Sequence, residues 1–158
     1  MLLKASCYFD IPLERVEMPF KARGGEGNSI IGYLRVPKNS SAAPFPLLVS
    51  WGGIDGFKEE QLNDPILERG IATLAIDGPG VGDSPIKGSE DAERLFGAVF
   101  DWVKTRETLD SNRVGIWGYS TGGYWAVKVA YVYKDRLACA VSQGGPVHYA
   151  FEPEWIRT

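Results

Sequence analysis

The residues from 114 to 123 constrain the fold more than any other stretch, and they read Val-Gly-Ile-Trp-Gly-Tyr-Ser-Thr-Gly-Gly. The first four favour a buried strand, and the residues after the serine are compatible with a helix. Between them, Gly118 and Gly122 flank Ser120 at a spacing of two. A turn this sharp leaves no room for side chains at the glycines and lifts the serine hydroxyl above the sheet edge. The sequence therefore predicts a strand, a tight turn and a helix, with Ser120 at the apex.

This spacing in this context is that of a nucleophile elbow, and it predicts that Ser120 is, or descends from, the nucleophile of a hydrolase. Chance occurrence of the string is the alternative, and the flanking strand and helix favour the elbow. The backbone N–H after the nucleophile, here that of Thr121, would be one donor to the oxyanion. We expect Gly53 or Ile54, in the loop after an earlier strand, to supply the other. The alternative for Gly52-Gly53 is a simple turn.

Short apolar runs alternate with segments of helical periodicity through the middle of the chain. Buried strands are expected at 47–51, 71–76, 114–117 and 137–142, and helices at 59–69, 92–106 and 121–134. This alternation predicts an α/β fold with a doubly wound, mostly parallel sheet covered by helices on both faces. Residues 13–20 alternate between apolar and polar side chains, and residues 30–36 read as the returning strand. Together they predict an antiparallel hairpin before the parallel sheet.

The length of 158 residues fits a single domain. Its expected parts are a lead-in (1–12), an accessory hairpin and loop (13–46), a core (47–142) and an irregular tail (143–158). A complete sheet of this type would need more strands after the one that follows the nucleophile helix. We therefore expect an incomplete domain, truncated at that strand.

The general base that Ser120 requires is harder to place. In the elbow fold the order along the chain is serine, acid, histidine, and the one histidine is His148. It comes one strand too early, so we expect it to line the substrate pocket or pack, with Tyr119 as a second candidate substrate contact. Asp135 is expected at the far end of the helix. Asp77 precedes a glycine-rich turn that lacks the residues of a phosphate loop, and we expect it to cap local amides.

Composition limits the partners. The net charge of −3 and the scattered basic residues argue against nucleic acid and anionic membrane surfaces. No apolar run approaches the ~20 residues of a membrane span, and no signal peptide is evident. Two cysteines and one histidine predict reduced thiols and no metal site or cofactor. We expect a cytoplasmic protein that binds a small-molecule carbonyl compound and that can form a homo-oligomer through an exposed sheet edge.

Three stretches together resemble a known family. They are Gly-Gly-Ile-Asp-Gly-Phe-Lys-Glu-Glu at 52–60, Asp-Gly-Pro-Gly-Val-Gly at 77–82 and Gly-Tyr-Ser-Thr-Gly-Gly at 118–123. The chain resembles the α/β-hydrolases over residues 13–158. Within them it is most similar to the group of 2,6-dihydropseudooxynicotine hydrolase, the fermentation-respiration switch protein and fungal heptaketide hydrolases. The first two stretches discriminate this group better than the elbow, which is generic.

The resemblance implies a serine hydrolase acting on a carbonyl compound, in some members cleaving a carbon–carbon bond beside a ketone. It maps Ser120 to the nucleophile and Gly53, Ile54 and Thr121 to the oxyanion region. The group also carries a helical N-terminal domain and later strands bearing the acid and the histidine, so we expect little turnover from this chain alone. The alternatives are a segment of a prolyl-oligopeptidase-type peptidase, or a non-catalytic remnant or interaction module that completes its sheet by association.

Overall fold

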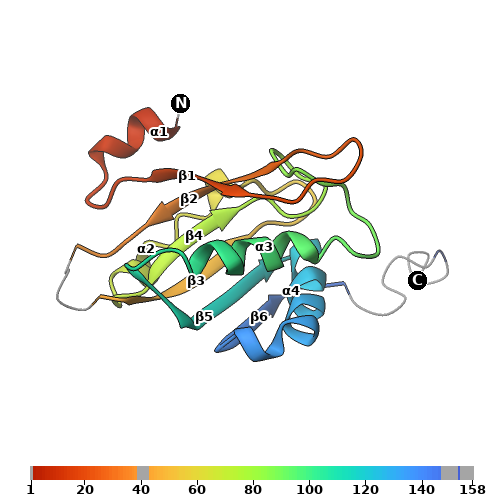
Figure 1. The fold of residues 1–158 in the computed structure, drawn as a ribbon. Coiled ribbons are helices and arrows are strands. Elements are labelled where there is room, and N and C mark those ends of the chain that lie inside the picture. Colours follow the sequence, from red (N-terminus) through yellow and green to blue (C-terminus); the bar gives the residue numbers. More distant parts are fainter. Residues whose placement is uncertain (1, 39–42, 147–152, 154–158) are drawn as a thin grey trace.

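A computed structural model describes residues 2–38, 43–146 and 153. Its six strands form one sheet in the order β1-β2-β4-β3-β5-β6 (Figure 1). The strands are β1 (Glu14–Pro19), β2 (Ser29–Arg35), β3 (Phe45–Trp51), β4 (Ala72–Ile76), β5 (Leu109–Tyr119) and β6 (Cys139–Gln143). The helices are α1 (Leu2–Ala5), α2 (Asp64–Leu67), α3 (Arg94–Val103) and α4 (Thr121–Val132), with 3-10 turns η1 (Ser6–Tyr8), η3 (Lys58–Glu60) and η4 (Lys134–Arg136).

The sheet is mixed, as the sequence predicts. β1 pairs with β2, and β2 with β4, in antiparallel fashion. The remaining pairs, β4 with β3, β3 with β5, and β5 with β6, are parallel. The expected hairpin and the expected parallel core are therefore both present, and the hairpin joins the core sheet through β2. This is the mostly parallel α/β architecture that the sequence predicts.

The two faces of the sheet are covered unequally. Helices α3 and α4 lie on one face, where Figure 1 shows them in front of the strands. The apolar positions of α3 recur at helical spacing and are buried, and the ring of Phe96 lies 4.4 Å from that of Trp51 on β3. The other face is met by shorter segments. There Asn63, just before α2, donates to Ser50 Oγ at 2.9 Å.

The helix expected over 59–69 is not formed as one element. The structure has η3, a break, and then the single turn α2. Asn63 adopts a positive φ of 51°, and Pro65 lies in the first turn of α2. A left-handed residue followed by proline interrupts a continuous helix, so the sequence expectation was wrong here.

The strand expected to be buried at 137–142 is also different. β6 lies at the edge of the described sheet, and all five of its residues, including Cys139, are exposed. Its apolar composition suggested burial, but only β5 flanks it within the described residues. An edge of this kind can pair with another strand. Association with a second copy stays a prediction.

Candidate active site at the nucleophile elbow

Ser120 occupies the sharp turn between β5 and α4. Its backbone has φ 53° and ψ −126°, a conformation that residues other than glycine rarely adopt. Such a conformation costs about 1–3 kcal/mol and persists only where its surroundings enforce it. Here Ser120 N donates to Gln143 O at 2.8 Å, and Gly123 N donates to Ser120 O at 2.8 Å. The strand–turn–helix geometry expected from the sequence is present, and the Ser120 side chain is exposed.

The elbow glycines are needed because backbones approach closely. A Cβ at Gly118 would lie 2.5 Å from Gly122 C, and one at Gly122 would lie 2.8 Å from Trp51 Cδ1 and closer still to Gly52 O. Real Cβ atoms do not make such contacts with backbone. The Trp51 indole completes the packing by donating from Nε1 to Gly122 O at 2.9 Å. β3, β5 and α4 are therefore locked together beneath Ser120.

The loop after β3 reaches the serine. A Cβ at Gly53 would lie 2.8 Å from Ser120 Cβ, 3.1 Å from Ser120 Oγ and 3.4 Å from Thr121 Oγ1. Only glycine fits this approach of backbone to side chain. The structure thus brings together Gly53, Ser120 and Thr121, three residues that the sequence assigns to one site. Ile54, the fourth, is 77% exposed beside them.

The site favours a developing negative charge. Ser120 immediately precedes α4, whose first N–H groups have no carbonyl partner within the helix, so the N–H of Thr121 is directed outward. The positive end of the helix dipole adds to this field. The glycine-rich loop after β3 approaches the same hydroxyl at Gly53. Backbone donors converging on one point beside a hydroxyl can bind an oxyanion.

A small cavity opens beside the elbow. It has a volume of about 270 Å³ and is lined mainly by backbone of the glycine-rich loops after β3 and β4 and by the start of α4. Its larger side chains are Ile54, Pro79, Val81 and Trp125. Gly53 and Thr121 line it as well, so it adjoins two residues that the sequence predicts as oxyanion donors. We call it the elbow cavity. Its apolar walls suit a small uncharged group.

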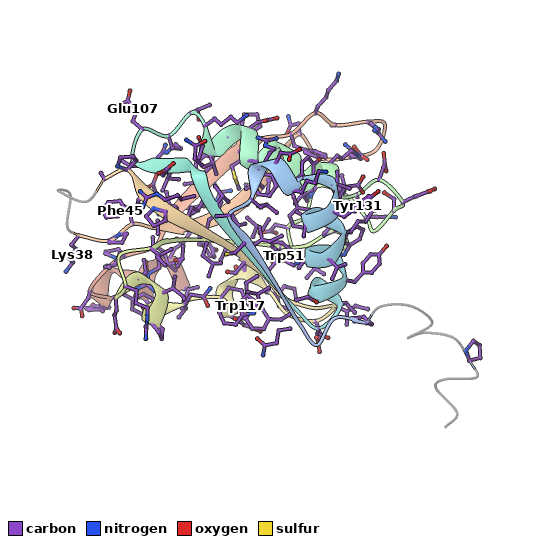
Figure 2. All side chains as sticks on the ribbon, turned by 90° about the horizontal axis from the view of Figure 1, so that it is seen from below. Lys38, Phe45, Trp51, Glu107, Trp117 and Tyr131 are labelled. Atoms are coloured by element: carbon purple, nitrogen blue, oxygen red, sulfur yellow. The ribbon has the colours of Figure 1, made fainter. Side chains whose placement is uncertain are left out.

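The other sequence-assigned residues are placed less centrally. Tyr119 is not part of the elbow cavity; its ring stacks on Trp117 at 4.6 Å, and burial raises the pKa of its phenol. Figure 2 shows Trp117 on the side of the sheet away from α3. His148 lies outside the described residues. Asp135 falls in η4, beyond the far end of the 12-residue helix α4, as expected.

Asp77 caps local amides, as the sequence predicts. Its Oδ1 accepts from Lys58 N at 2.8 Å, and its Oδ2 accepts from Asp83 N at 2.9 Å. The sequence did not predict the partner of its charge. Lys58 Nζ lies 2.8 Å from Asp77 Oδ2, and both side chains are 2% exposed. The signal in the sequence that could have suggested this pair is that Lys58 lies in the stretch 52–60 and Asp77 in the stretch 77–82, the two stretches that distinguish the group which the chain resembles.

Among the described residues, no three His, Cys, Asp or Glu side chains are grouped as ligands for a metal ion. Within residues 2–38, 43–146 and 153, no helix combines the length and the hydrophobicity needed to cross a bilayer.

Comparisons with known proteins place this chain among esterases and related hydrolases. A family model described as "Esterase FrsA-like" matches residues 4–154. The chain is 34% identical over 148 residues to 2,6-dihydropseudooxynicotine hydrolase of Paenarthrobacter nicotinovorans, covering 90% of this chain and 38% of that protein. It is 32% identical over 142 residues to Esterase FrsA of Serratia proteamaculans, covering 87% of this chain and 34% of the esterase.

A solved structure supports the same relationship. The crystal structure of 2,6-dihydroxy-pseudo-oxynicotine hydrolase superposes with a TM-score of 0.78 at 33% identity, over 90% of this chain and 39% of that one. The chain therefore spans well under half the length of these relatives. Its homologues are α/β-hydrolase enzymes.

Proposed function

The chain belongs to the FrsA-like esterase family of α/β-hydrolases, and on that premise we propose that it carries the nucleophile of a serine hydrolase. Ser120 Oγ attacks a substrate carbonyl carbon and forms a covalent acyl-serine. The observation that carries the proposal is the approach of Gly53 to Ser120 and Thr121, where a Cβ would lie 2.8 Å from Ser120 Cβ. The loop after β3 and the start of α4 meet beside this hydroxyl.

The backbone donors stabilise the step that this geometry serves. As the new C–O bond forms, the carbonyl oxygen gains negative charge and is bound by the N–H of Thr121 and that of Gly53 or Ile54. Removing one such donor from a serine hydrolase typically costs about 3–4 kcal/mol of transition-state stabilisation. The hydroxyl proton passes to a general base and then to the leaving group, and water later cleaves the acyl-serine.

The proposed substrate is an ester, or a ketone whose adjacent carbon–carbon bond is cleaved. The name Esterase FrsA supports the ester, and the resemblance to 2,6-dihydropseudooxynicotine hydrolase supports the ketone. In either case the carbonyl carbon becomes the acyl group on Ser120, and the leaving group takes up the proton. The elbow cavity, with Ile54, Val81 and Trp125 in its wall, would accept a small apolar portion of the substrate.

Labelling with a fluorophosphonate tests the assignment of the nucleophile. This reagent phosphonylates an activated serine and releases fluoride. We expect modification at Ser120, mapped by peptide mass spectrometry, and its loss in Ser120→Ala. The matched control is Ser142→Ala, because Ser142 bonds to Gly123 O at 2.9 Å close to the elbow but is given no chemical role. Labelling elsewhere, or no labelling of the folded protein, contradicts the proposal.

We expect little sustained turnover from the 158-residue chain by itself. The one histidine in the sequence, His148, comes one strand too early in the chain order of an elbow fold to be the expected base. A p-nitrophenyl ester has a leaving group that needs no proton, so acylation requires only that solvent take up the serine proton. Deacylation also requires an activated water and is slower. A stopped-flow trace should show at most a burst. Sustained turnover that disappears in Ser120→Ala would contradict this expectation.

A further inference from the structure

Lys58 is a buried cation that the proposed chemistry does not use. Its side chain is 2% exposed, and Nζ lies 2.8 Å from Asp77 Oδ2 and 2.8 Å from Asp83 Oδ2. Glu59 Oε1 is 3.5 Å away, and the ring of Tyr33 lies 5.5 Å from Nζ. A buried ion pair is seldom a net source of stability, because desolvation offsets the attraction. Its position therefore calls for another explanation.

The positive charge of Lys58 is stabilised by its carboxylate neighbours. Burial alone would lower the pKa of Lys58, but hydrogen bonds to Asp77 and Asp83 outweigh it and raise that pKa above its usual value. The hydrogen bond from Lys58 in turn lowers the pKa of Asp83. Lys58 is therefore a fixed ammonium group at neutral pH.

The network joins the two glycine-rich loops at the carboxyl ends of β3 and β4. Asp77, directly after β4, accepts from both the backbone N and the Nζ of Lys58, at 2.8 Å each. It also accepts from Asp83 N within its own loop. Gly82 makes room for this carboxylate: it has φ +49°, and a Cβ there would lie 2.7 Å from Asp77 Cγ. One buried carboxylate thus fixes both loops.

The loop that Lys58 closes is the one that approaches the serine. It leaves β3 at Trp51, passes Ser120 at Gly53 and ends in η3. Between these points, the backbone hydrogen bond described within the loop runs from Gly56 N to Gly53 O and is long, at 3.4 Å. The position of the loop therefore depends on the contacts at its two ends. Trp51 fixes one end through Gly122, and Lys58 fixes the other.

We propose that Lys58 is a positioning residue, which with Asp77 and Asp83 forms a clamp that sets the β3 loop at the distance from Ser120 that oxyanion binding requires. We call these three residues the loop clamp. This inference rests on the proposed function, since it assigns the clamp to the donors of Gly53 or Ile54. A misplacement of about 1 Å in such a site can reduce the rate by about 100-fold.

Amide hydrogen exchange tests the clamp without relying on chemistry at Ser120. Lys58→Met alone would leave Asp77 buried and unpaired, so the main variant is Lys58→Met with Asp77→Asn, which is neutral overall. We expect amide exchange at Gly56, Lys58 and Asp83 to accelerate at least about tenfold, while exchange in β3 and β4 is unchanged. Unchanged exchange at all three amides would overturn the proposal.

The rate of fluorophosphonate labelling then links the clamp to the site. We expect labelling of Ser120 in the double variant to slow by about 10- to 100-fold, and Lys58→Arg, which keeps the charge, to recover part of the rate. The matched control is Arg35→Met, which removes a buried cation at the other ends of the strands. Faster exchange with an unchanged labelling rate would overturn the positioning role. Absence of labelling in the unmodified protein would instead refute the proposed function and leave the exchange result standing.

Discussion

The opposite ends of the central strands each bury one cation, and the two cations are held differently. At the carboxyl ends, Lys58 is paired with Asp77, which is 2% exposed. At the amino ends, Arg35 is 4% exposed, but the carboxylate of its partner Asp64 is 60% exposed. Arg35 pairs in register with Thr73, near the start of β4, whereas Asp77 directly follows the end of that strand. The two sites are comparable in burial but opposite in position.

Their remaining contacts show what each cation does. Arg35 donates to the carbonyl oxygens of Ile11 and Leu62, at 2.9 Å each, and its guanidinium lies 5.6 Å from the ring of Phe9. It therefore fastens the N-terminal lead-in and the segment before α2 to the sheet. Lys58 joins two loops beside Ser120. Damage at the amino ends should reduce stability alone, and damage at the carboxyl ends should also reduce reactivity.

The largest effect is expected from Gly122→Ala, at the carboxyl ends. The new Cβ would meet Gly52 O and lie 2.8 Å from Trp51 Cδ1, and neither partner can move freely. We expect a loss of about 3 kcal/mol in the free energy of unfolding, with labelling of Ser120 slowed by about 100-fold in the protein that remains folded. Urea unfolding and labelling kinetics measure the two quantities.

Gly88→Ala is the matched control for that substitution. Gly88 lines the same elbow cavity, and a Cβ there would meet nothing within 4 Å. We expect its free energy of unfolding to stay within about 0.5 kcal/mol of the unmodified protein. Equal damage from both alanines would mean that close packing at Gly122 is not what sustains the elbow.

Arg35→Met tests whether damage at the amino ends of the strands affects stability without affecting the reactivity of Ser120. It removes the hydrogen bonds to Ile11 O and Leu62 O, and we expect a loss of about 2 kcal/mol in the free energy of unfolding, measured by urea titration. The rate at which Ser120 is labelled in the folded protein should change by less than about twofold, because the polar partners of Arg35 in the described part of the chain lie outside residues 52–57 and the elbow. A labelling rate that falls as far as in the loop-clamp variant would remove the contrast between the two cations.

The smallest effect concerns pH. The hydrogen bond from Lys58, aided by the charge of Arg15, lowers the pKa of Asp83 in the folded protein. The ionised carboxylate therefore stabilises the fold above its unfolded pKa of about 3.9, and this contribution is lost as pH falls through the lower folded pKa. The Asp83 side chain is 67% exposed, which limits the effect to about 1 kcal/mol. Asp83→Asn should lower stability at pH 7 and match the unmodified protein near pH 2. A constant difference across this range would contradict the assignment.

Much of the fold could be predicted because its signals are local. The apolar runs of β3 and β4, the alternation of β1 and the glycine spacing around Ser120 each reflect packing within a few residues. The β6 strand was located correctly but its burial was not, since burial depends on what lies over a strand. The helix expected over 59–69 is interrupted just before Pro65, because Asn63 adopts a positive φ that its residue type alone does not predict.

The candidate site was predictable in part for the same reason. Ser120, Thr121 and Gly53 lie in glycine motifs whose geometry follows from the missing side chains. The charge pairing of Lys58 was missed because Lys58-Glu59-Glu60 resembles a solvated charged run, and its partner Asp77 lies 19 residues away. Only the folding of β3 beside β4 brings them together. Pairings of this kind depend on strand order, which no local pattern specifies.

A crystal structure of the phosphonylated protein tests the central claim most directly. The phosphoryl oxygen of the Ser120 adduct occupies the place of the oxyanion in the proposed reaction. We predict that it lies about 2.7–3.1 Å from Thr121 N and from the backbone N of Gly53 or Ile54. An adduct whose phosphoryl oxygen contacts neither loop, or an adduct on a residue other than Ser120, would contradict the assignment of this elbow as an active site.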